Sequence, residues 1–209
     1  QRGRRVLVLD SSNKIGKKIL MSGGGRCNFT NLFVEPENFL STNPHFCISA
    51  LNRYTQWDFI ALVEKHRIPY HERKHGQLFC NDSAKDILAM LVAECEQAGV
   101  VIRTHCEISA ITAQDAGTAR FRLRTAKGDL TAESLVVASG GLSIPTQGAS
   151  GFGYEVARQF GHSVLPTRAG LVPFTFSDGF KSGTERLSGL AVESTLSVPD
   201  AAFSENLLF

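Results

Sequence analysis

The chain has 209 residues, of which 43% are hydrophobic, and this is enough apolar material for a globular core in one large domain. The formal net charge is only +2, and no apolar run reaches the roughly 18 residues of a membrane span, so we expect a cytoplasmic protein without membrane association. Five cysteines, an odd number with no C-x-x-C pair, argue against a disulfide framework or a zinc knuckle.

The first predicted element is a buried parallel strand in the sequence RRVLVLD, which ends at Asp10. In a dinucleotide-binding βαβ unit, an acid that follows the second strand accepts hydrogen bonds from ribose hydroxyls, about 20 residues after a glycine turn. Asp10 fits that position, but too few residues precede it for the first strand, the turn and the helix. We therefore expect a partial unit whose first βα element lies upstream of Gln1.

Two helices are predicted from capping signals. Thr55 and Asp58 form a capping box that begins a helix ending before Pro69. A second helix begins at Ser83, carries an apolar face, and stops at Gly99.

The next predicted elements are strands over residues 100–105, 107–112, 119–125 and 134–139. The middle ones are expected to form a small antiparallel excursion near residues 105–130, between parallel strands. A short helix follows over residues 153–160, and the pattern then becomes strand-like without a strong helix. We therefore predict an α/β fold with a partial Rossmann-type domain over residues 1–165 and the start of a β-rich insert over residues 166–209.

Positive charge gathers near the amino terminus, where residues 1–30 hold seven basic side chains and one acid. A local cationic pole on an otherwise mildly acidic chain suits a small anionic ligand better than a long nucleic acid. An ordinary solvated charge cluster explains the same pattern, so it does not decide the function by itself.

A glycine-rich loop, SGGGRCN, occupies residues 22–28 within this pole. Glycines let backbone N–H groups converge on an anion and let a ligand approach the main chain, and Arg26 adds a charged fork. A flexible turn is the alternative interpretation. The loop is not a Walker phosphate loop, because the Gly-Lys-Ser/Thr ending is absent.

A second glycine-rich segment runs through residues 135–162, where an apolar stretch leads into Ser139, Gly140 and Gly141. Glycines at the carboxyl end of a strand let a ligand lie against the backbone at the switch point of a doubly wound sheet. Turn residues would produce the same pattern. Asp10 and the cationic pole in the same chain favour the ligand-binding interpretation.

Other candidate side chains carry weaker signals. Cys27 beside Arg26 could be a redox thiol, but a buried structural cysteine fits better. Three histidines in residues 66–75 lack metal-ligand spacing, and we expect no metal site. Tyr54 and Trp57 are expected in the core.

Four stretches of the chain form a recognisable pattern: RGRRVLVLDSSNKIGKKILMSGGGRCNFTN, HGQLFCNDSAKDIL, LVVASGGLSIPTQGASGFGYEVARQFGH and LVPFTF. Together they resemble the BaiN/YhiN-like family of FAD-binding oxidoreductases, which includes the aminoacetone oxidase type. The resemblance implies a Rossmann-type FAD domain interrupted by a β-rich insert. It also implies a glycine turn before this chain and a closing FAD segment after it, so the chain is expected to be truncated at both ends.

The resemblance also implies which residues meet FAD. Asp10 would bind the adenosine ribose, and a second set would lie along the cofactor: Lys18, Gly23, Gly24, Gly25, Arg26, Cys27 and Asn28. Ser139, Gly140 and Gly141 would form another contact, with a loop shaped by Gly148, Gly151 and Gly153. No catalytic acid or base is identified.

The expected function is therefore flavin-dependent transfer of hydride or electrons between a small organic substrate and NAD(P)H or another acceptor. The partners expected are a small-molecule substrate, with nucleic acid unfavoured, and an oligomeric state that the sequence does not define. One alternative is a nucleotide-binding module without turnover, because the first glycine turn is missing. A weaker alternative is a nucleic-acid-associated protein that uses the basic pole.

Overall fold

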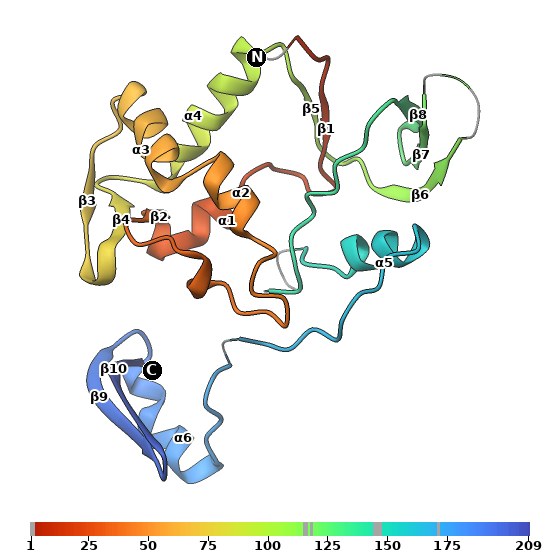
Figure 1. Cartoon of the computed structure of the whole chain (residues 1–209). Helices are drawn as coiled ribbons and strands as arrows, with labels where there is room; N and C mark the ends of the chain where they lie inside the picture. Colours follow the sequence, from red (N-terminus) through yellow and green to blue (C-terminus); the bar gives the residue numbers. More distant parts are fainter. Residues whose placement is uncertain (1–2, 115–116, 118, 144–147, 171) are drawn as a thin grey trace. The chain divides into compact units, whose positions relative to one another are not determined.

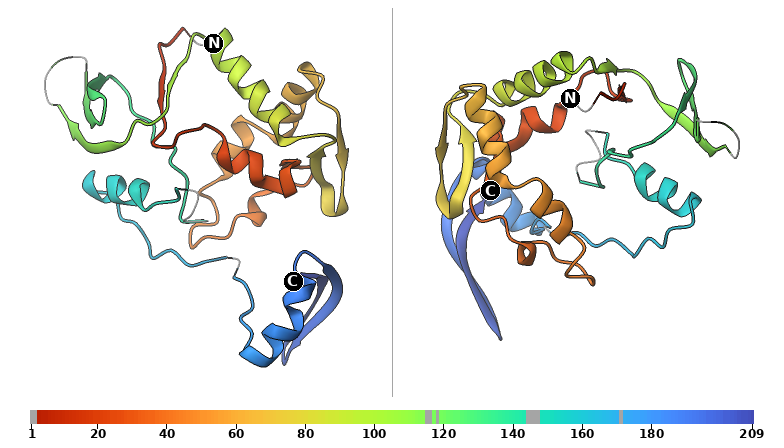
Figure 2. Two further views of the ribbon diagram at one scale, coloured as in Figure 1. Left: turned by 180° about the vertical axis from the view of Figure 1, so that it is seen from behind. Right: turned by 45° about the horizontal axis from the view of Figure 1, so that its top comes forward.

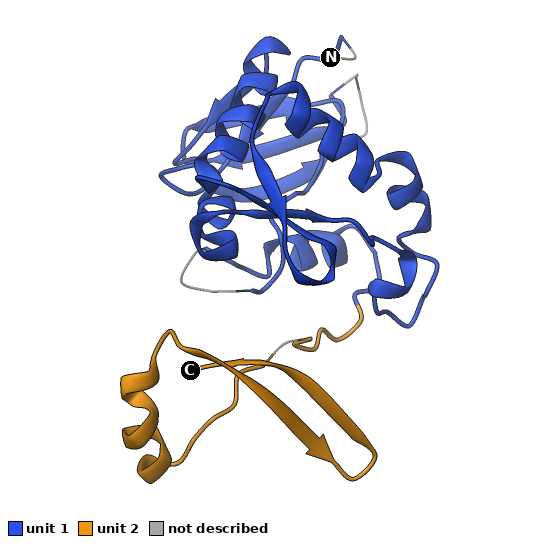
Figure 3. Cartoon of the chain, turned by 90° about the vertical axis from the view of Figure 1, so that its left-hand side faces the viewer, with its two compact units in different colours: residues 1–164 blue, residues 165–209 orange. Residues whose placement is uncertain are grey.

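The computed structural model describes residues 3–114, 117, 119–143, 148–170 and 172–209 (Figure 1). The chain divides into two compact units, residues 1–164 and 165–209 (Figure 3). Helices and strands mix along the chain, which confirms the predicted α/β class. The assignment of these residues to a partial FAD domain and a substrate-binding insert stays a prediction.

The first strand, β1 (Leu7–Leu9), pairs in parallel with β5 (Val101–Arg103), and Leu7 lies opposite Val101. Figure 2 shows this red and green pair from two further directions. The parallel pairing agrees with the expectation, but the predicted burial is wrong. β1 has a single strand neighbour among the described residues, and Leu7 and Val8 are each more than a third exposed.

An antiparallel three-stranded sheet, in the order β2-β4-β3, has no counterpart among the predicted elements. It consists of β2 (Asn28–Asn31), β3 (Tyr70–Glu72) and β4 (Gln77–Cys80). The strands are only three or four residues long, too short for a clear alternating pattern. β4 is the central strand and carries the buried side chains of Leu78, Phe79 and Cys80.

The two predicted helices form close to their expected ends. Helix α3 (Gln56–Lys65) begins with the reciprocal capping box, in which the Asp58 backbone N–H donates to Thr55 Oγ1 (3.2 Å) and the Thr55 N–H donates to Asp58 Oδ2 (2.7 Å). Helix α4 (Ala84–Gln97) begins at Ser83, whose Oγ accepts the Lys85 N–H at 3.2 Å. Gly99 follows α4 with φ +68°, a left-handed conformation that glycine adopts without strain.

Helices α3 and α4 and the β2-β4-β3 sheet enclose one hydrophobic core. Its buried members are Cys27, Val63, Cys80, Ala84, Ile87 and Met90. Tyr54 and Trp57 were expected in this core, but they are 54% and 57% exposed, so that prediction is wrong. Trp57 lies one turn before Ile60 on the helix, so apolar periodicity places it beside the buried face and does not reveal that its indole stays open to solvent.

An ionic cluster joins α3 to α4. Glu94 Oε1 accepts hydrogen bonds from Lys65 Nζ and meets His66 Nε2, both at 2.7 Å. The hydrogen bonds from Lys65 and His66 lower the pKa of Glu94 from 4.5 to about 2. A depressed carboxyl pKa stabilises the folded state above pH 4.5, and this contribution is lost as the pH falls towards 2.

We therefore expect Glu94→Gln to lower the free energy of unfolding at pH 7 and to leave a smaller difference from the wild type at pH 3. Urea unfolding at the two pH values measures this difference. Glu96→Gln removes an exposed carboxylate from the same helix and serves as the control. An equal difference at both pH values would contradict the role of the Glu94 carboxylate.

The predicted antiparallel excursion is present as a meander in the order β6-β7-β8, although residues 115, 116 and 118 of its range lie outside the described residues. The strands are β6 (Ile108–Ala113), β7 (Phe121–Thr125) and β8 (Gly128–Ala132). Their inward residues Ile111 and Leu123 pack with Val156 of α5 (Phe152–Gln159).

The strand predicted over residues 134–139 does not form. These residues have no ladder partner among the described strands, and Val136 is 84% exposed. An apolar run indicates a strand only where a neighbouring strand pairs with it, and the sequence does not state which strand that would be.

Shorter elements complete the first unit. They are α1 (Lys17–Met21), α2 (Ile48–Arg53) and the 3₁₀ turns η1 (Ser22–Gly25), η2 (Pro36–Asn38) and η3 (Lys74–Gly76).

The second unit contains a helix and a hairpin. Helix α6 (Asp178–Thr184) runs into the turn η5 (Glu185–Leu187), and β9 (Ala191–Val198) pairs antiparallel with β10 (Ala201–Leu208). Helix α6 was not predicted, because its two glycines weaken the helical pattern. Among the described helices of both units, none combines the length and the apolar character needed to cross a membrane.

Candidate functional site

The acid predicted to meet a ribose lies at the carboxyl end of β1. The Asp10 backbone N–H donates to Arg103 O of the neighbouring β5 at 2.9 Å, which fixes the residue against the parallel pair. Its Oδ1 accepts the Ser12 N–H at 2.8 Å, so the side chain closes a local turn. The other oxygen, Oδ2, makes no hydrogen bond with any described residue and remains available as an acceptor.

The loop at residues 22–28 has a backbone that glycine makes possible. Gly23, Gly24 and Gly25 all have positive φ, at +57°, +65° and +85°. A Cβ added to Gly23 would lie 2.6 Å from Phe79 Cε1 and 2.8 Å from the backbone N of Asn28, whereas Gly24 faces open space. The loop therefore packs on one side against β4 and presents bare backbone on the other.

The three residues that follow the glycines point in different directions. The Arg26 side chain is exposed, while its carbonyl accepts the Cys80 N–H at 2.9 Å. Cys27 is buried in the core. Asn28 begins β2, and in the amide orientation that satisfies its neighbours it donates to Leu78 O at 3.3 Å and Thr30 O at 3.1 Å.

The cysteine pair in this region is structural in character. Cys27 and Cys80 are 5% and 0% exposed and belong to the same core. Burial, with a smaller contribution from nearby Cys27, raises the pKa of the Cys80 thiol to about 11. Cys80 therefore stays protonated at neutral pH and is a poor nucleophile.

The second glycine segment packs against the start of α5. A Cβ on Gly153 would lie 3.1 Å from Ser139 Oγ, and one on Gly141 would lie 3.3 Å from the Tyr154 hydroxyl. Gly151 is the residue before α5. Gly140 and Gly148 both have positive φ, at +76° and +84°. Small residues at these positions let the 139–143 segment lie close to the helix.

Lys18 of α1 contacts the second glycine segment. Its Nζ donates to Ser143 Oγ at 3.0 Å and lies 3.9 Å from the position that a Cβ on Gly140 would take. The ammonium therefore stands between α1, which leads directly into the 22–28 loop, and the 139–143 segment. The hydrogen bond between Lys18 and Ser143 in this way joins residues that are far apart in the sequence.

The positive charge of this region is not neutralised locally. Lys14, Lys17 and Arg26 form no ion pair with any carboxylate in the described part of the chain. Cations without internal partners attract an anionic ligand, and low local counter-charge strengthens that attraction.

No group of three His, Cys, Asp or Glu side chains suited to a metal ion occurs among the described residues.

Two residues at this location were missed by the sequence interpretation. Ser143 binds Lys18, and Tyr154 faces Gly141. Ser143 lies within the second glycine segment, which the sequence analysis had identified. No rule of residue spacing predicts its contact with Lys18, which lies far away in the sequence.

The chain matches the family described as HI0933-like protein Rossmann domain over residues 1–182. It is 54% identical over 210 positions to the ribosomal RNA dihydrouridine synthase of Escherichia coli, covering 100% of this chain and 52% of that protein. It is 48% identical over 209 positions to the protein of the same name from Haemophilus influenzae, covering 99% of this chain and 52% of the relative. A 3-dehydro-bile acid delta(4,6)-reductase from Clostridium scindens is 27% identical over 169 positions, covering 80% of this chain and 40% of that protein.

The chain thus spans about half the length of the curated relatives it matches. Their names correct one expectation. Two of them are named for an activity on ribosomal RNA, so the prediction of a small-molecule substrate with nucleic acid unfavoured is wrong. That prediction depended on the small net charge and on the small extent of the cationic pole, which was expected to suit a small anion better than a long nucleic acid.

The broader part of the expected resemblance is confirmed, because the matching family is an FAD-binding Rossmann family. The narrower aminoacetone oxidase type finds no support in the relatives' names. With a match that covers residues 1–182, the chain belongs to the HI0933-like family of Rossmann-domain proteins.

Proposed function

We propose that this chain contributes the FAD-binding residues of a ribosomal RNA dihydrouridine synthase. The observation that carries the proposal is the 54% identity, over the full length of this chain, to a protein of that name. A relative with the same name is 48% identical, whereas the relative named for a bile-acid substrate is only 27% identical.

The residues present fit an FAD molecule. The free Oδ2 of Asp10 at the end of a parallel strand is suited to a ribose hydroxyl. The left-handed backbone of Gly24 and Gly25 leaves room for close approach of a ligand, and the Lys18 ammonium supplies positive charge beside Gly140. These features support the proposed cofactor contacts, and the other predicted cofactor residues belong to the same two segments.

The proposed reaction adds two electrons and two protons to the C5=C6 bond of a uridine in ribosomal RNA, which becomes the single bond of dihydrouridine. FAD supplies the two-electron chemistry when it is bound, and NAD(P)H is the proposed source of the electrons. In this scheme Lys18, Arg26 and the glycine loop hold the cofactor and balance its negative charge. Lys14 and Lys17 are then available to attract the phosphates of the RNA.

The complete protein that contains this chain tests the proposal. A strain without the gene is expected to lack dihydrouridine in its ribosomal RNA, and the wild-type gene is expected to restore it. The purified protein is expected to show the absorption bands of oxidised flavin. Asp10→Asn should lower flavin retention by about tenfold, as loss of a hydrogen bond to a charged group does.

Asp129→Asn changes a carboxylate that pairs with Arg122 outside this site, and it serves as the matched control. A colourless protein that FAD does not reconstitute would contradict the cofactor assignment. A yellow protein whose absence leaves the dihydrouridine of ribosomal RNA unchanged would contradict the substrate and favour nucleotide binding without this turnover.

A further inference from the structure

The outer face of the β6-β7-β8 meander carries a row of arginine side chains. On β7, Leu123 is buried and packs with Val156 of α5 on the inner face of the sheet. Side chains alternate along a strand, so Arg122 and Arg124 extend from the opposite, solvent-facing side. Arg120, two positions before Arg122, continues the row, and all three arginines are exposed. Three positive charges therefore follow one another at every second position.

A hollow of about 150 Å³ lies on this face, and its lining residues are Ala110, Thr112, Arg122 and Arg124. Thr112 of β6 lies opposite Arg122 in the register of the two strands. Ala110 lies opposite Arg124. These small side chains leave the sheet surface open beside the arginines, and the threonine adds a hydroxyl donor. The hollow thus combines two guanidinium groups and a hydroxyl with space for an anionic group.

The charge of the two arginines that line the hollow is only half compensated. Asp129 Oδ2 of β8 accepts from Arg122 at 2.6 Å from Nη2 and 3.1 Å from Nε. Arg124 forms no ion pair or side-chain hydrogen bond with any residue in the described ranges. One guanidinium charge is therefore free to attract an anion into the hollow.

Arg120 adds to this excess of positive charge. Its Nε donates to the backbone carbonyl of Glu133 at 2.8 Å, and this acceptor is neutral. The carboxylate of Glu133 lies 4.0 Å from the guanidinium of Arg4. Arg120 is thus fixed in direction by a group that does not neutralise it.

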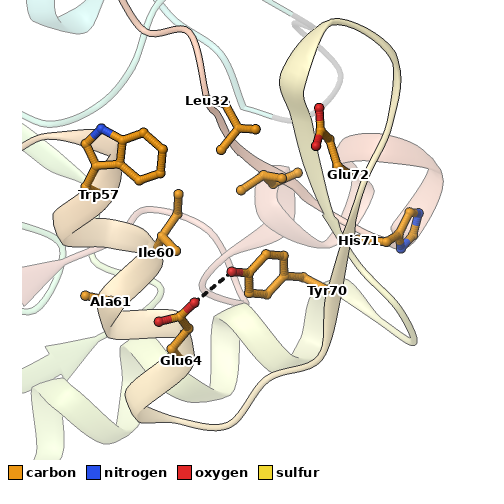
Figure 4. A pocket seen from close by; sticks show the side chains of 9 residues that line it. Leu32, Trp57, Ile60, Ala61, Glu64, Tyr70, His71 and Glu72 are labelled. Carbon is orange, nitrogen blue, oxygen red and sulfur yellow. Dashed lines mark hydrogen bonds between the residues drawn. The ribbon is translucent and has the colours of Figure 1, made fainter.

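A larger pocket, of about 420 Å³, lies between α3 and the β2-β4-β3 sheet, but its charge has the opposite sign (Figure 4). Its lining includes Glu64, which accepts the Tyr70 hydroxyl at 2.8 Å, and Glu72. Both glutamates are exposed, and neither forms an ion pair within the part of the chain that the structure describes. Carboxylates repel phosphate, so the larger pocket is unsuited to a nucleic acid and the meander face is suited to it.

The chemistry of the meander face selects the phosphate backbone of a nucleic acid over its bases. A guanidinium group is planar and donates paired N–H bonds to phosphate oxygens. A row of such groups along an extended strand can contact successive phosphates of one nucleic-acid strand. None of the outward residues on the described strands β6, β7 and β8 is aromatic, so the face offers no ring on which a base stacks. Contacts of this kind hold an RNA in place without reading its sequence.

We propose that the outer face of the meander binds the phosphate backbone of the RNA substrate, with one phosphate in the hollow between Arg122, Arg124 and Thr112. The inference rests on the proposed function, because the names of two relatives are the reason to prefer RNA over an acidic protein as the occupant. It assigns the holding of the RNA to residues that are separate from those assigned to FAD.

The complete protein tests this inference with fluorescein-labelled oligoadenylate, which offers phosphates but no uridine. Fluorescence anisotropy gives the affinity at a series of salt concentrations. Each phosphate contact contributes about 0.7 to the slope of log affinity against log salt for a single strand. Arg124→Gln should therefore lower the slope by about 0.7, and the double variant Arg122→Gln/Arg124→Gln by about 1.4, with weaker binding in both.

Two further variants serve as controls. Arg158→Gln removes the same charge from an exposed position on α5, which packs on the inner face of the sheet, and it should leave the slope unchanged. Asp129→Asn removes the carboxylate that competes for Arg122, so it should strengthen RNA binding. The melting temperature of each variant verifies that it is folded.

An unchanged affinity and slope in the double variant would overturn this inference, even where the dihydrouridine of ribosomal RNA depends on the gene. A lowered slope in a protein whose absence leaves that dihydrouridine unchanged would overturn the proposed function and would still support the RNA-binding face. Oligoglutamate that binds as tightly as oligoadenylate, with the same dependence on Arg124, would overturn the assignment to RNA and indicate an acidic protein segment.

Discussion

Replacement of Gly23 by alanine is expected to lower the free energy of unfolding by about 3 kcal/mol. Two costs combine at this position. An alanine in the left-handed region costs about 1–2 kcal/mol, and forcing a methyl group into a packed site adds about 1–3 kcal/mol. The new Cβ would lie 2.6 Å from Phe79 Cε1 and 2.8 Å from the Asn28 backbone N. Phe79 cannot move aside cheaply, because it is 6% exposed and its ring contacts both the His71 ring and the Arg73 guanidinium.

Gly24→Ala is the matched control for this experiment. Gly24 has φ +65° and nothing within 4 Å of its added Cβ, so only the backbone cost of about 1–2 kcal/mol remains. Urea unfolding of both variants at neutral pH measures the difference. Equal destabilisation of the two variants would show that contact with Phe79 and Asn28 does not decide the cost.

Replacement of Lys18 by methionine is expected to lower the FAD affinity of the complete protein by at least about tenfold. Methionine keeps most of the side-chain length and removes the charge. A hydrogen bond to a charged group contributes about 1.5–3 kcal/mol, which corresponds to a factor of about ten or more in affinity. Lys18 is chosen because its Nζ lies 3.0 Å from Ser143 Oγ, where α1 contacts the 139–143 segment. Equilibrium titration of the apoprotein with FAD, followed by flavin fluorescence, gives the affinity.

Lys14→Met removes the same charge from the same basic stretch. The amine of Lys14 has no hydrogen bond to the 139–143 segment among the described residues, so its removal should change FAD affinity little. If both variants lost affinity equally, the effect would come from the general charge of the basic pole. Ser143→Ala should have a smaller effect than Lys18→Met, because the charge remains.

Local signals in the sequence predicted much of the fold. The capping box at Thr55 and Asp58, the cap at Ser83 and the stop at Gly99 all act within a few residues, and the structure contains each of them. A cap depends only on the chemistry of nearby side chains and backbone, which explains why it can be read from one sequence.

Features that depend on distant partners were predicted less well. The run at 134–139 has the composition of a strand but no partner among the strands that the structure describes. Strands β2, β3 and β4 have partners but too little length to produce a pattern. Trp57 is apolar and lies on an apolar helix, yet it faces solvent. In each case the tertiary environment, and not local propensity, decides the outcome.

The candidate site shows the same division. The two glycine segments were singled out from their composition, but the contact between Lys18 of α1 and Ser143 of the second segment requires the fold. The role of Asp10 as a ribose ligand, and those of the glycines, stay predictions. The wrong prediction of a small-molecule substrate has a different cause. A net charge of +2 averages a basic pole with an acidic remainder, and this average hides the local positive charge.

The pairing of β1 with β5 has a consequence for the rate and order of folding. Leu7 meets Val101, so this parallel pair closes only after the chain has passed through the four helices α1 to α4 and the antiparallel β2-β4-β3 sheet. Closing so long a loop costs chain entropy that is offset only when the strands are in register, which makes the step intrinsically slow. Asp10 is held by the carbonyl of Arg103, so its carboxylate reaches its native position only in that step. A ligand that binds this carboxylate will therefore stabilise the closed pair and slow its opening, and amide hydrogen exchange at Asp10 will report its binding.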